Sequence, residues 1–361
     1  MATRSEIIAA AWSAGVVGAD DGVPTHVKLE CRAEVVIADG CECEPMLYAS
    51  SHLLVHHARE VVDGLRLAMQ ATGASRGILA FINSSARLEQ AVQEAVHPDI
   101  EIYPAPPIYP ANDAAVLTYG ATGRLVPSFG NAESAGVLIL HVETLLNLSR
   151  AMQGVPVTHR TLTVAGEVAR PRVVRLPVGA RSGDAIRCAG GPLIERFSVL
   201  LGGPVGGRLA DALVEPITKN TSAIIVLPSN HIQVQKRTRA LSMMLLRARS
   251  ACFSCRECTD SCPRYLAGLQ LEPHLIMRAI SQSMDSLHTS ITSAVNCSEC
   301  GLCDSYTCKM GISPRQICHE IKAHLSAMGW LRTSPPEPTQ SVRDGYHERQ
   351  VPIASLPARL G

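Results

Sequence analysis

Two short segments of this sequence each carry four cysteines in close succession. Residues 252–263 read CFSCRECTDSCP, and residues 297–308 read CSECGLCDSYTC. In both segments the first three cysteines are separated by two residues, and the fourth follows after three residues in the first segment and four in the second. Two intervening residues let the chain turn and direct successive sulfurs at one point, so thiolates with this spacing hold three corners of a cubane iron–sulfur cluster.

The fourth cysteine of each segment commonly binds the other cluster in proteins that carry two. The sequence therefore predicts two [4Fe–4S] clusters with eight cysteine ligands. The predicted ligands of the first cluster are Cys252, Cys255, Cys258 and Cys308, and those of the second are Cys297, Cys300, Cys303 and Cys262. A proline follows the fourth cysteine in the first segment, whereas Lys309 stands at that place in the second.

Two other uses of clustered cysteines agree less well with this spacing. A structural zinc site usually takes four ligands as two C-x2-C pairs with a longer loop between them, whereas each segment here has three cysteines at strict three-residue intervals. A disulfide framework requires an oxidising compartment. The first residues, MATRSEIIAAAWSAG, lack the long apolar core of a signal peptide. We therefore expect a reducing cytoplasm, which also suits oxygen-sensitive clusters.

Composition and charge argue against nucleic acid as the main partner. The 361 residues are enough for two or three domains, 46% of them are hydrophobic, and the formal net charge is +1. There is no run of eighteen apolar residues, so we expect no transmembrane helix. One local basic stretch is interpreted as a solvated helix face, with docking of an acidic redox partner as the alternative. It contains Lys236, Arg237, Arg239, Arg247 and Arg249.

The first part of the chain has the pattern of an α/β domain. Short β-branched runs at 33–39, 76–82 and 100–105 predict buried strands. Residues 52–73 have apolar side chains at helical spacing and end with Gly73. Alternation of strands and helices predicts a mostly parallel sheet.

A different pattern follows in the second half. Residues 160–191 alternate short strands with Gly and Pro turns around one short helical piece, which is typical of a small β-grasp module. A strand is expected at 222–228, a helix at 231–250 leading into the first cysteine segment, and a helix at 272–284 between the two segments. The proline-rich residues 333–361 predict an extended tail.

Several further motifs occur in an order that is characteristic of one lineage. They are AGVVGADDGVPTHVKL (14–29), GCECEP (40–45), YPANDAAVLTYGATGRLVP (109–127), HVETLLNLSRAM (141–152), LTVAGEV (162–168) and GGPVGGR (202–208). With the two cysteine segments, residues 5 to 330 resemble the C subunit of Rnf-type electron-transport complexes. They are more closely similar to the cobalamin reductases of propanediol-utilising bacterial microcompartments. Many motifs in one order are far more specific than any single motif.

This resemblance implies a division of the chain into domains. Residues 1–155 are expected to form a domain like the flavin-binding subunit of respiratory complex I, 156–220 a soluble-ligand-binding β-grasp domain, 221–332 an α-helical two-cluster ferredoxin-like domain, and 333–361 the tail. The family binds FMN and receives hydride from NADH. A flavin takes two electrons as hydride and releases them singly, which suits clusters that carry one electron each.

The resemblance also implies a function and partners. We expect an iron–sulfur electron-transfer protein that passes electrons to a corrin cofactor or a redox partner protein. Cobalamin-dependent enzymes and microcompartment shell proteins are the partners that the family suggests, and the expected location is the cytoplasm, inside such a microcompartment.

The flavin-binding positions depart from the family pattern. The positions carried over are Gly18, Gly22, Lys28, Asp39, Glu42, Glu44, Asn112, His141, Glu143 and Thr144. The loop from Gly18 to Lys28 is one residue shorter than in the family and has Asp20 and Asp21 where glycines are expected. Carboxylates in such a loop repel a phosphate unless they point away from it. Asp39, Asn112 and His141 also differ from the family residues.

Two hypotheses remain from these departures. In the first, FMN is retained and the protein is an NADH-dependent reductase of the cobalamin-reductase type. In the second, the flavin site is vestigial and the protein is a non-catalytic electron conduit or adaptor docked to a separate dehydrogenase. A third use, binding of a soluble ligand by the β-grasp module, stays open. The motifs name no catalytic residue under any of them.

Overall fold

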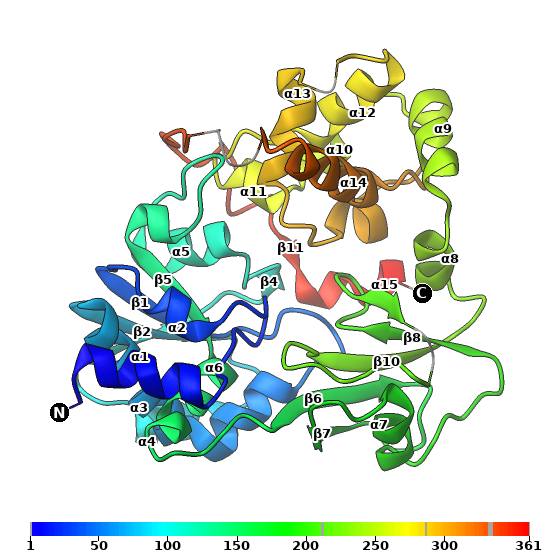
Figure 1. Cartoon of the computed structure of the whole chain (residues 1–361). Helices are drawn as coiled ribbons and strands as arrows, with labels where there is room; N and C mark the ends of the chain where they lie inside the picture. The colour runs from blue at the N-terminus through cyan, green and yellow to red at the C-terminus, as the bar shows by residue number, and fades with distance from the viewer. Residues whose placement is uncertain (1, 211–212, 286, 331–334, 361) are drawn as a thin grey trace. The chain divides into compact units, whose positions relative to one another are not determined.

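The computed structural model describes residues 2–210, 213–285, 287–330 and 335–360. The chain divides into two compact units, each made of two stretches of sequence (Figure 1). The first unit comprises Met1–Pro107 and Gly136–Ser229, and the second comprises Ile108–Ala135 and Asn230–Gly361. The α/β strands and the β-grasp strands thus belong to one unit, and the cysteine segments belong to the other.

A four-stranded parallel sheet forms the centre of the α/β part, as the sequence predicts. Its order is β3-β2-β1-β5, and every neighbouring pair is parallel. The strands are β1 Val35–Gly40, β2 Arg76–Phe81, β3 Ile100–Pro104 and β5 Val137–His141. All six residues of β1 are buried, because β1 lies in the middle of a sheet that carries helices.

Helices pack on this sheet with a core of aliphatic side chains. The helices are α1 Arg4–Ser13, α2 Thr25–Lys28, α3 Ala49–Thr72, α4 Ala86–Ala95 and α6 Val142–Ala151. The long helix α3 packs against α6, α4, β1 and β2. It ends at Gly73, whose φ of 78° is left-handed, so the expected helix end is confirmed.

A five-stranded sheet makes up the β-grasp part of the same unit. Its order is β7-β6-β10-β8-β9, with β10 parallel to β6 and the other pairs antiparallel. The strands are β6 His159–Gly166, β7 Arg172–Pro177, β8 Phe197–Leu201, β9 Arg208–Ala210 and β10 Ala223–Pro228. Helix α7 Ser182–Cys188 packs against β7 and β10 of this sheet, and α3 contacts β6.

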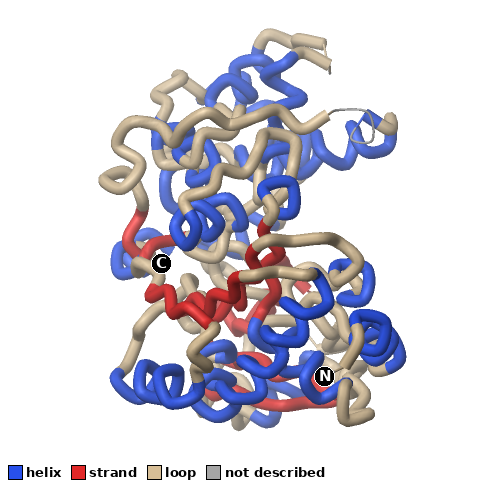
Figure 2. The backbone as a smooth tube through the Cα atoms, turned by 90° about the vertical axis from the view of Figure 1, so that its left-hand side faces the viewer, coloured by secondary structure: helices blue, strands red, loops and turns tan. Residues whose placement is uncertain are grey.

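The second unit consists mainly of helices and loops, with one short strand pair (Figure 2). Its main helices are α5 Ala114–Thr122, α8 Ile232–Arg237, α9 Leu241–Ala251, α10 Glu257–Asp260, α11 Pro263–Leu266, α12 Pro273–Ser281, α13 Thr289–Thr292 and α14 Pro314–Ala327. The strand pair is β4 Ile108–Tyr109 with β11 Val351–Pro352.

The helix expected over 231–250 is two helices, α8 and α9. Ala240, with φ −65° and ψ 145°, is extended and precedes the first turn of α9. At the end of α8 the Thr238 hydroxyl donates to the carbonyl of Val234 at 3.2 Å, a side-chain bond that competes with helix continuation. Apolar periodicity alone did not reveal this break.

The proline-rich C-terminal residues pack on the second unit. Tyr346 is 5% exposed, and its ring lies edge-on to Tyr119 at a centroid distance of 5.1 Å. Arg349 donates to the Asp260 carboxylate at 2.8 Å. Residues 333, 334 and 361 of the expected tail lie outside the described residues. No helix in the described part of the chain is both long and apolar enough to cross a membrane.

Candidate functional site

The two cysteine segments have the same backbone conformation. In the first, Cys252 ends α9, and Ser254 and Arg256 have positive φ angles of 58° and 68°. In the second, Glu299 and Gly301 occupy the matching places, two and four residues after Cys297, with φ angles of 59° and 81°. Left-handed residues alternating with other conformations turn successive backbone N–H groups toward one side. Accordingly, the N–H of Glu299 lies 3.3 Å from the Cys297 sulfur.

Each segment surrounds a pocket to which the other segment contributes. The first pocket is lined by all four thiols predicted for the first cluster, Cys252, Cys255, Cys258 and Cys308. The second is lined by all four predicted for the second, Cys262, Cys297, Cys300 and Cys303. Cys258 also borders the second pocket. The fourth cysteine of each segment therefore lies with the three leading cysteines of the other.

The thiols surround spaces rather than single points. Among the residues that the structure describes, no three His, Cys, Asp or Glu side chains come close enough to hold one metal ion. A tetrahedral zinc ion needs four sulfurs about 2.3 Å from one point. A four-iron cube is larger, so its ligands stand further apart. Four thiols around each pocket are the donor set that a cube takes.

Burial favours the protonated form of several of these thiols. It raises the pKa of Cys258 and of Cys262 to about 12, and it raises the pKa of Cys303 well above its ordinary value. Thiolate is the form that binds iron, so cluster assembly must displace these protons. The thiolates that result would neutralise the charge of the bound metal.

The second pocket is held by residues far away in sequence but within the same unit. Arg264 forms an ion pair with the buried Asp113 at 2.8 Å, and Asp113 also caps the first turn of α5. The side chain of Asn296 accepts from the N–H of Phe129 at 2.6 Å and donates to the carbonyl of Gln270 at 2.8 Å. The stretch Ile108–Ala135 thereby braces the loops that carry the second set of thiols.

The second pocket contains one cysteine to which the sequence assigned no role. Cys318, on α14, is 1% exposed and borders this pocket. It hydrogen-bonds the Cys297 thiol, and this bond is the main cause that lowers the pKa of Cys297. Its position within a helix carries no spacing signal, so sequence reasoning had no means of finding it.

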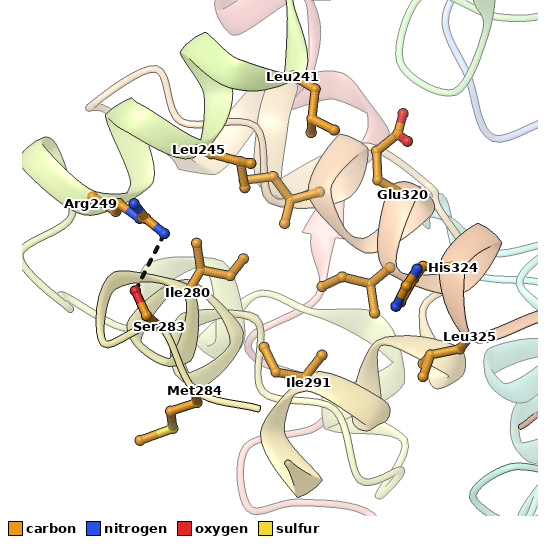
Figure 3. A pocket seen from close by; sticks show the side chains of 12 residues that line it. Leu241, Leu245, Arg249, Ile280, Ser283, Met284, Ile291, Glu320, His324 and Leu325 are labelled. Carbon is orange, nitrogen blue, oxygen red and sulfur yellow. Dashed lines mark hydrogen bonds between the residues drawn. The ribbon is translucent and has the colours of Figure 1, made fainter. Parts of the chain in front are cut away.

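A larger pocket of the second unit contains no thiol. It has a volume of about 490 Å³ and is lined mostly by aliphatic side chains from α9, α12, α13 and α14. Figure 3 shows these side chains facing a common space, with Arg249 bonded to Ser283 at 3.4 Å. Because none of the cluster cysteines lines it, it is not part of the candidate electron-transfer site.

The loop that would hold a flavin phosphate is closed by its own side chains. Asp21 accepts from the N–H of Val23 at 3.0 Å and pairs with Lys28 at 2.5 Å. The N–H groups of Gly18 and Gly22 bond to carbonyls within the same loop, at 2.7 and 2.8 Å. A Cβ atom on Gly18 would lie 2.0 Å from the Asp21 carboxylate. Since the lysine and these N–H donors are taken, the loop does not fit a phosphate group.

The acidic residues kept from the family pattern make structural contacts. Glu42 accepts from the N–H groups of Ser50 and Ser51 at 2.8 and 2.9 Å, at the start of α3. Glu44 accepts from the N–H groups of Val205 and Gly206, at 2.7 and 3.1 Å, in the glycine-rich loop of the β-grasp part. Both carboxylates therefore have partners that satisfy them without a ligand.

Glu143 and Thr144 have similar roles. Glu143 forms an ion pair with Arg160, a residue that the motifs did not single out, and both side chains are 4% exposed. The Thr144 hydroxyl accepts from the N–H of Ala19 at 2.9 Å, and Arg160 donates to the carbonyl of Ala19 at 3.0 Å. These contacts hold the flavin-type loop against α6 and β6.

Three further candidates from the sequence are Asp39, His141 and Asn112. Asp39 is buried at the end of β1 and accepts from the N–H of Cys41 at 2.9 Å. His141 accepts from the N–H of Glu143 at 3.1 Å, and its other ring nitrogen lies 3.0 Å from the Ser50 hydroxyl. Asn112 is exposed and belongs to the second unit, whereas the other flavin candidates belong to the first.

Two family models match parts of the chain. The Nuo51 FMN-binding domain matches residues 12–150, and a 4Fe-4S dicluster domain matches residues 251–313. The first match covers the parallel sheet with its helices, and the second covers both cysteine segments. These matches agree with the flavin-type and iron–sulfur parts expected from the sequence.

Relatives match along most of the chain. Cobalamin reductase PduS of Salmonella typhimurium is 38% identical over 351 residues, which is 97% of this chain and 77% of that protein. The protein of the same name from Citrobacter freundii is 37% identical over the same shares. The C subunit of the Na(+)-translocating ferredoxin:NAD(+) oxidoreductase complex of Acetobacterium woodii is 30% identical over 72% of this chain and 58% of that protein.

A solved structure shares the fold. The NAD+-reducing [NiFe]-hydrogenase in its H2-reduced state contains a chain that matches with a TM-score of 0.56 and 21% identity. The match covers 91% of this chain and 66% of that one. At this level of identity the similarity is one of fold alone.

Proposed function

Because this chain belongs to the family of cobalamin reductases, we propose that it carries single electrons through two [4Fe–4S] clusters to a corrin cofactor or a partner protein. The observation that carries this proposal is the pair of thiol-lined pockets, each with three cysteines from one segment and the fourth from the other. Four thiols around one space are the donor set of a cubane cluster, which exchanges one electron.

The chain's own residues would prepare these sites in three ways. Eight thiols supply the ligands, and the left-handed turns at Ser254 and Glu299 direct them inward. The N–H of Glu299 lies at hydrogen-bonding distance from a ligand sulfur, and such bonds tune the reduction potential of a cluster. Near the second pocket, Lys322 donates to the carbonyl of Cys297 at 3.1 Å and to the Glu299 carboxylate at 2.6 Å, which holds the loop that carries Cys297 and Cys300.

The grouping of ligands across the two segments can be tested by iron content. Anaerobically purified protein is expected to contain about eight iron atoms, and Cys255→Ala about four, because one cluster is lost. Adding Cys308→Ala to Cys255→Ala removes ligands of the same cluster, so about four should remain. Adding Cys262→Ala to Cys255→Ala damages both clusters, so nearly all iron should be lost.

Cys188→Ala, at an exposed site outside both segments, is the control and should keep full iron content. If the two double variants lost iron equally, the grouping across segments would be wrong. Zinc in place of iron would overturn the electron-transfer proposal itself.

A second candidate function is favoured by the closed phosphate loop. In it the flavin site is vestigial, and the protein is an electron conduit docked to a separate dehydrogenase. The Asp21 carboxylate forms the ion pair with Lys28 that a flavin phosphate would otherwise form. In this case the chain neither binds FMN tightly nor oxidises NADH alone, and a partner protein delivers the electrons.

Flavin binding separates the two candidates. We expect no FMN to remain bound to the wild-type protein after incubation and desalting, and we expect Asp21→Gly to gain FMN affinity by about tenfold or more, since one repelling charge is removed from the loop. Flavin fluorescence titration measures both. Glu133→Gln, which removes a carboxylate in the other unit, is the control. Stoichiometric FMN on the wild-type protein, bleached by NADH, would establish the reductase instead.

We also propose that the protein works in the bacterial cytoplasm inside a microcompartment, with shell proteins among its partners. This rests on the family resemblance. Fractionation of native microcompartments followed by immunoblotting tests it, and recovery of the protein only in the unassembled fraction would contradict it.

A further inference from the structure

The first thiol pocket is more open to solvent than the second. Cys255 is exposed, whereas the four thiols predicted for the second cluster are all half-buried. Phe253 and Met310 also line the first pocket and are 66% and 42% exposed. A cluster near the surface is the one from which an electron can pass to another protein, because electron transfer requires close approach.

The helix that leads into this pocket has an exposed apolar ridge. Met243 and Leu246 of α9 are 48% and 55% exposed and lie three residues apart, so they adjoin on one helix face. Arg247 follows Met243 by four residues and adjoins it. Met244 and Ala248, on the adjoining face, are buried in the core of the second unit. Exposed apolar side chains that adjoin one another are typical of protein interaction surfaces.

Two arginines add positive charge to the same place. Arg239 donates to the carbonyl of Gly311 at 2.5 Å. A Cβ atom on Gly311 would lie 3.3 Å from a guanidinium nitrogen of Arg247 and 3.7 Å from one of Arg239. The two guanidinium groups therefore lie next to each other, beside Gly311. Gly311 directly follows Met310, which lines the first pocket. Their like charges repel, which favours a negatively charged partner.

The other charges at the mouth of the pocket are largely balanced. Lys309 pairs with Glu257 at 2.9 Å, which joins the two cysteine segments across the mouth. Arg256, which also lines the pocket, lies 3.8 Å from the carboxylates of Asp260 and Glu272. Arg239 and Arg247 add further positive charge beside the pocket, and the Asp304 carboxylate attracts Arg239. An apolar centre with an adjoining positive rim matches the usual anatomy of a protein interface, and complementary charge raises the association rate of a transient partner.

We propose that the α9 face, made of Arg239, Met243, Leu246, Arg247, Phe253 and Met310, is the docking surface for an acidic one-electron carrier protein that exchanges electrons with the first cluster. This rests on the proposed function in iron–sulfur electron transfer. The proposal adds to that function where on the chain electrons are exchanged, that the partner protein is acidic, and that the first cluster is the one that faces the partner. The 490 Å³ pocket lies along Leu241 and Leu245, on another flank of α9, and is not part of this surface.

Electron transfer to two protein acceptors of opposite charge tests the proposal. Full-length protein with intact clusters is reduced with dithionite, desalted and mixed in a stopped-flow instrument with plastocyanin, which is acidic, or with cytochrome c, which is basic. We expect plastocyanin to be reduced faster at low salt, with a rate that falls about tenfold or more as salt is raised. Cytochrome c should show no such fall.

The variants locate the effect on the chain. Arg239→Gln with Arg247→Gln should slow plastocyanin reduction at low salt by about fivefold or more and flatten its salt dependence. Arg247→Gln alone, which leaves the bond from Arg239 to Gly311 in place, should give a smaller change in the same direction. Leu246→Ser should slow the reaction at all salt concentrations.

The control variant removes two positive charges from the first unit, as many as the double variant of the α9 face removes. Arg59→Gln with Arg87→Gln changes two exposed arginines of α3 and α4 and should leave the plastocyanin rate unchanged. An equal effect of both double variants would overturn the docking surface, since only net charge would then matter. The proposal would also be overturned if the protein formed a dimer that Arg247→Gln dissociates, because a second copy of the chain would then cover this face. Failure to reduce even ferricyanide would instead overturn electron transfer itself.

Discussion

Single buried side chains in the flavin-type part have strongly shifted acidities. Asp39 and His141 are partners in register on the neighbouring strands β1 and β5. Burial raises the pKa of Asp39 to about 7, and the nearby charge of Asp20 adds to this effect. Burial lowers the pKa of His141 to about 3. Near pH 6 the folded protein therefore holds an uncharged carboxyl beside an uncharged imidazole.

These two shifts affect stability in opposite directions. Between about pH 4 and pH 6.5, folded Asp39 keeps a proton that the unfolded chain releases, so acidification stabilises the fold through Asp39. In the same range the unfolded chain protonates His141 while the folded chain does not, so acidification destabilises the fold through His141. Each contribution is about 1.4 kcal/mol per pH unit, and the two nearly cancel.

Removing either group should expose the contribution of the other. Relative to wild type, Asp39→Asn should lose stability more steeply as the pH falls from 6.5 to 4.5, by up to about 1.4 kcal/mol per pH unit. His141→Gln should lose stability less steeply than wild type over the same pH range, and the difference in slope should be similar in size. Urea unfolding followed by circular dichroism measures the slopes, with Asp63→Asn on the exposed face of α3 as control. Equal slopes in the two variants would contradict the assignment of charges.

At the level of whole elements, the contact between α3 and α6 depends on one glycine. A Cβ atom on Gly64 would lie 2.0 Å from the backbone carbonyl oxygen of Leu145. The two helices therefore approach so closely that only a residue without a side chain fits between them. Their packing also positions His141 and Glu143, which lie just before and within the first turn of α6.

Gly64→Ala should destabilise the first unit, although the same change at an exposed position within a helix usually stabilises a protein. Alanine is favoured over glycine by about 1 kcal/mol in a helix interior, but overpacking at a close contact costs about 1–3 kcal/mol. We expect a lower melting temperature by circular dichroism. Asp63→Ala, on the preceding residue but exposed, should leave it nearly unchanged. A Gly64→Ala protein more stable than wild type would show that the helices can separate at no cost.

For the molecule as a whole, the clusters are expected to be part of the core of the second unit. Cys252, Cys262, Cys297 and Cys308 pack against the buried aliphatic cluster that joins α9, α12 and α14. Binding of metal to sites that exist only in the folded state contributes to folding stability. Loss of iron should therefore loosen the second unit and leave the first one intact.

Hydrogen–deuterium exchange of holoprotein and chelator-treated protein checks this expectation. Exchange should become faster in both cysteine segments and in α14, while β1, β2, β6 and β10 should be unaffected. The Cys188→Ser variant should behave like wild type. Equal loosening of both units on iron removal would show that the clusters stabilise the protein in another way.

The features that depend on neighbours in sequence could be predicted from the sequence. Spacing within twelve residues was sufficient to recognise the two cysteine segments, because the C-x2-C-x2-C turns that direct three sulfurs inward are local. Strand and helix periodicity was sufficient for the parallel sheet and for α3, because burial on one face leaves a regular pattern.

The features that depend on distant partners were decided only by the fold. The pairing of Arg264 with Asp113 joins residues that are 151 positions apart, and the place of Cys318 beside the second pocket follows from how α14 packs. Asp21 could have repelled a phosphate or pointed away, but its partners Lys28 and Val23 show that it closes the loop. Sequence patterns record local spacing, whereas the partner of a charged side chain is set by contacts formed only when the chain is folded.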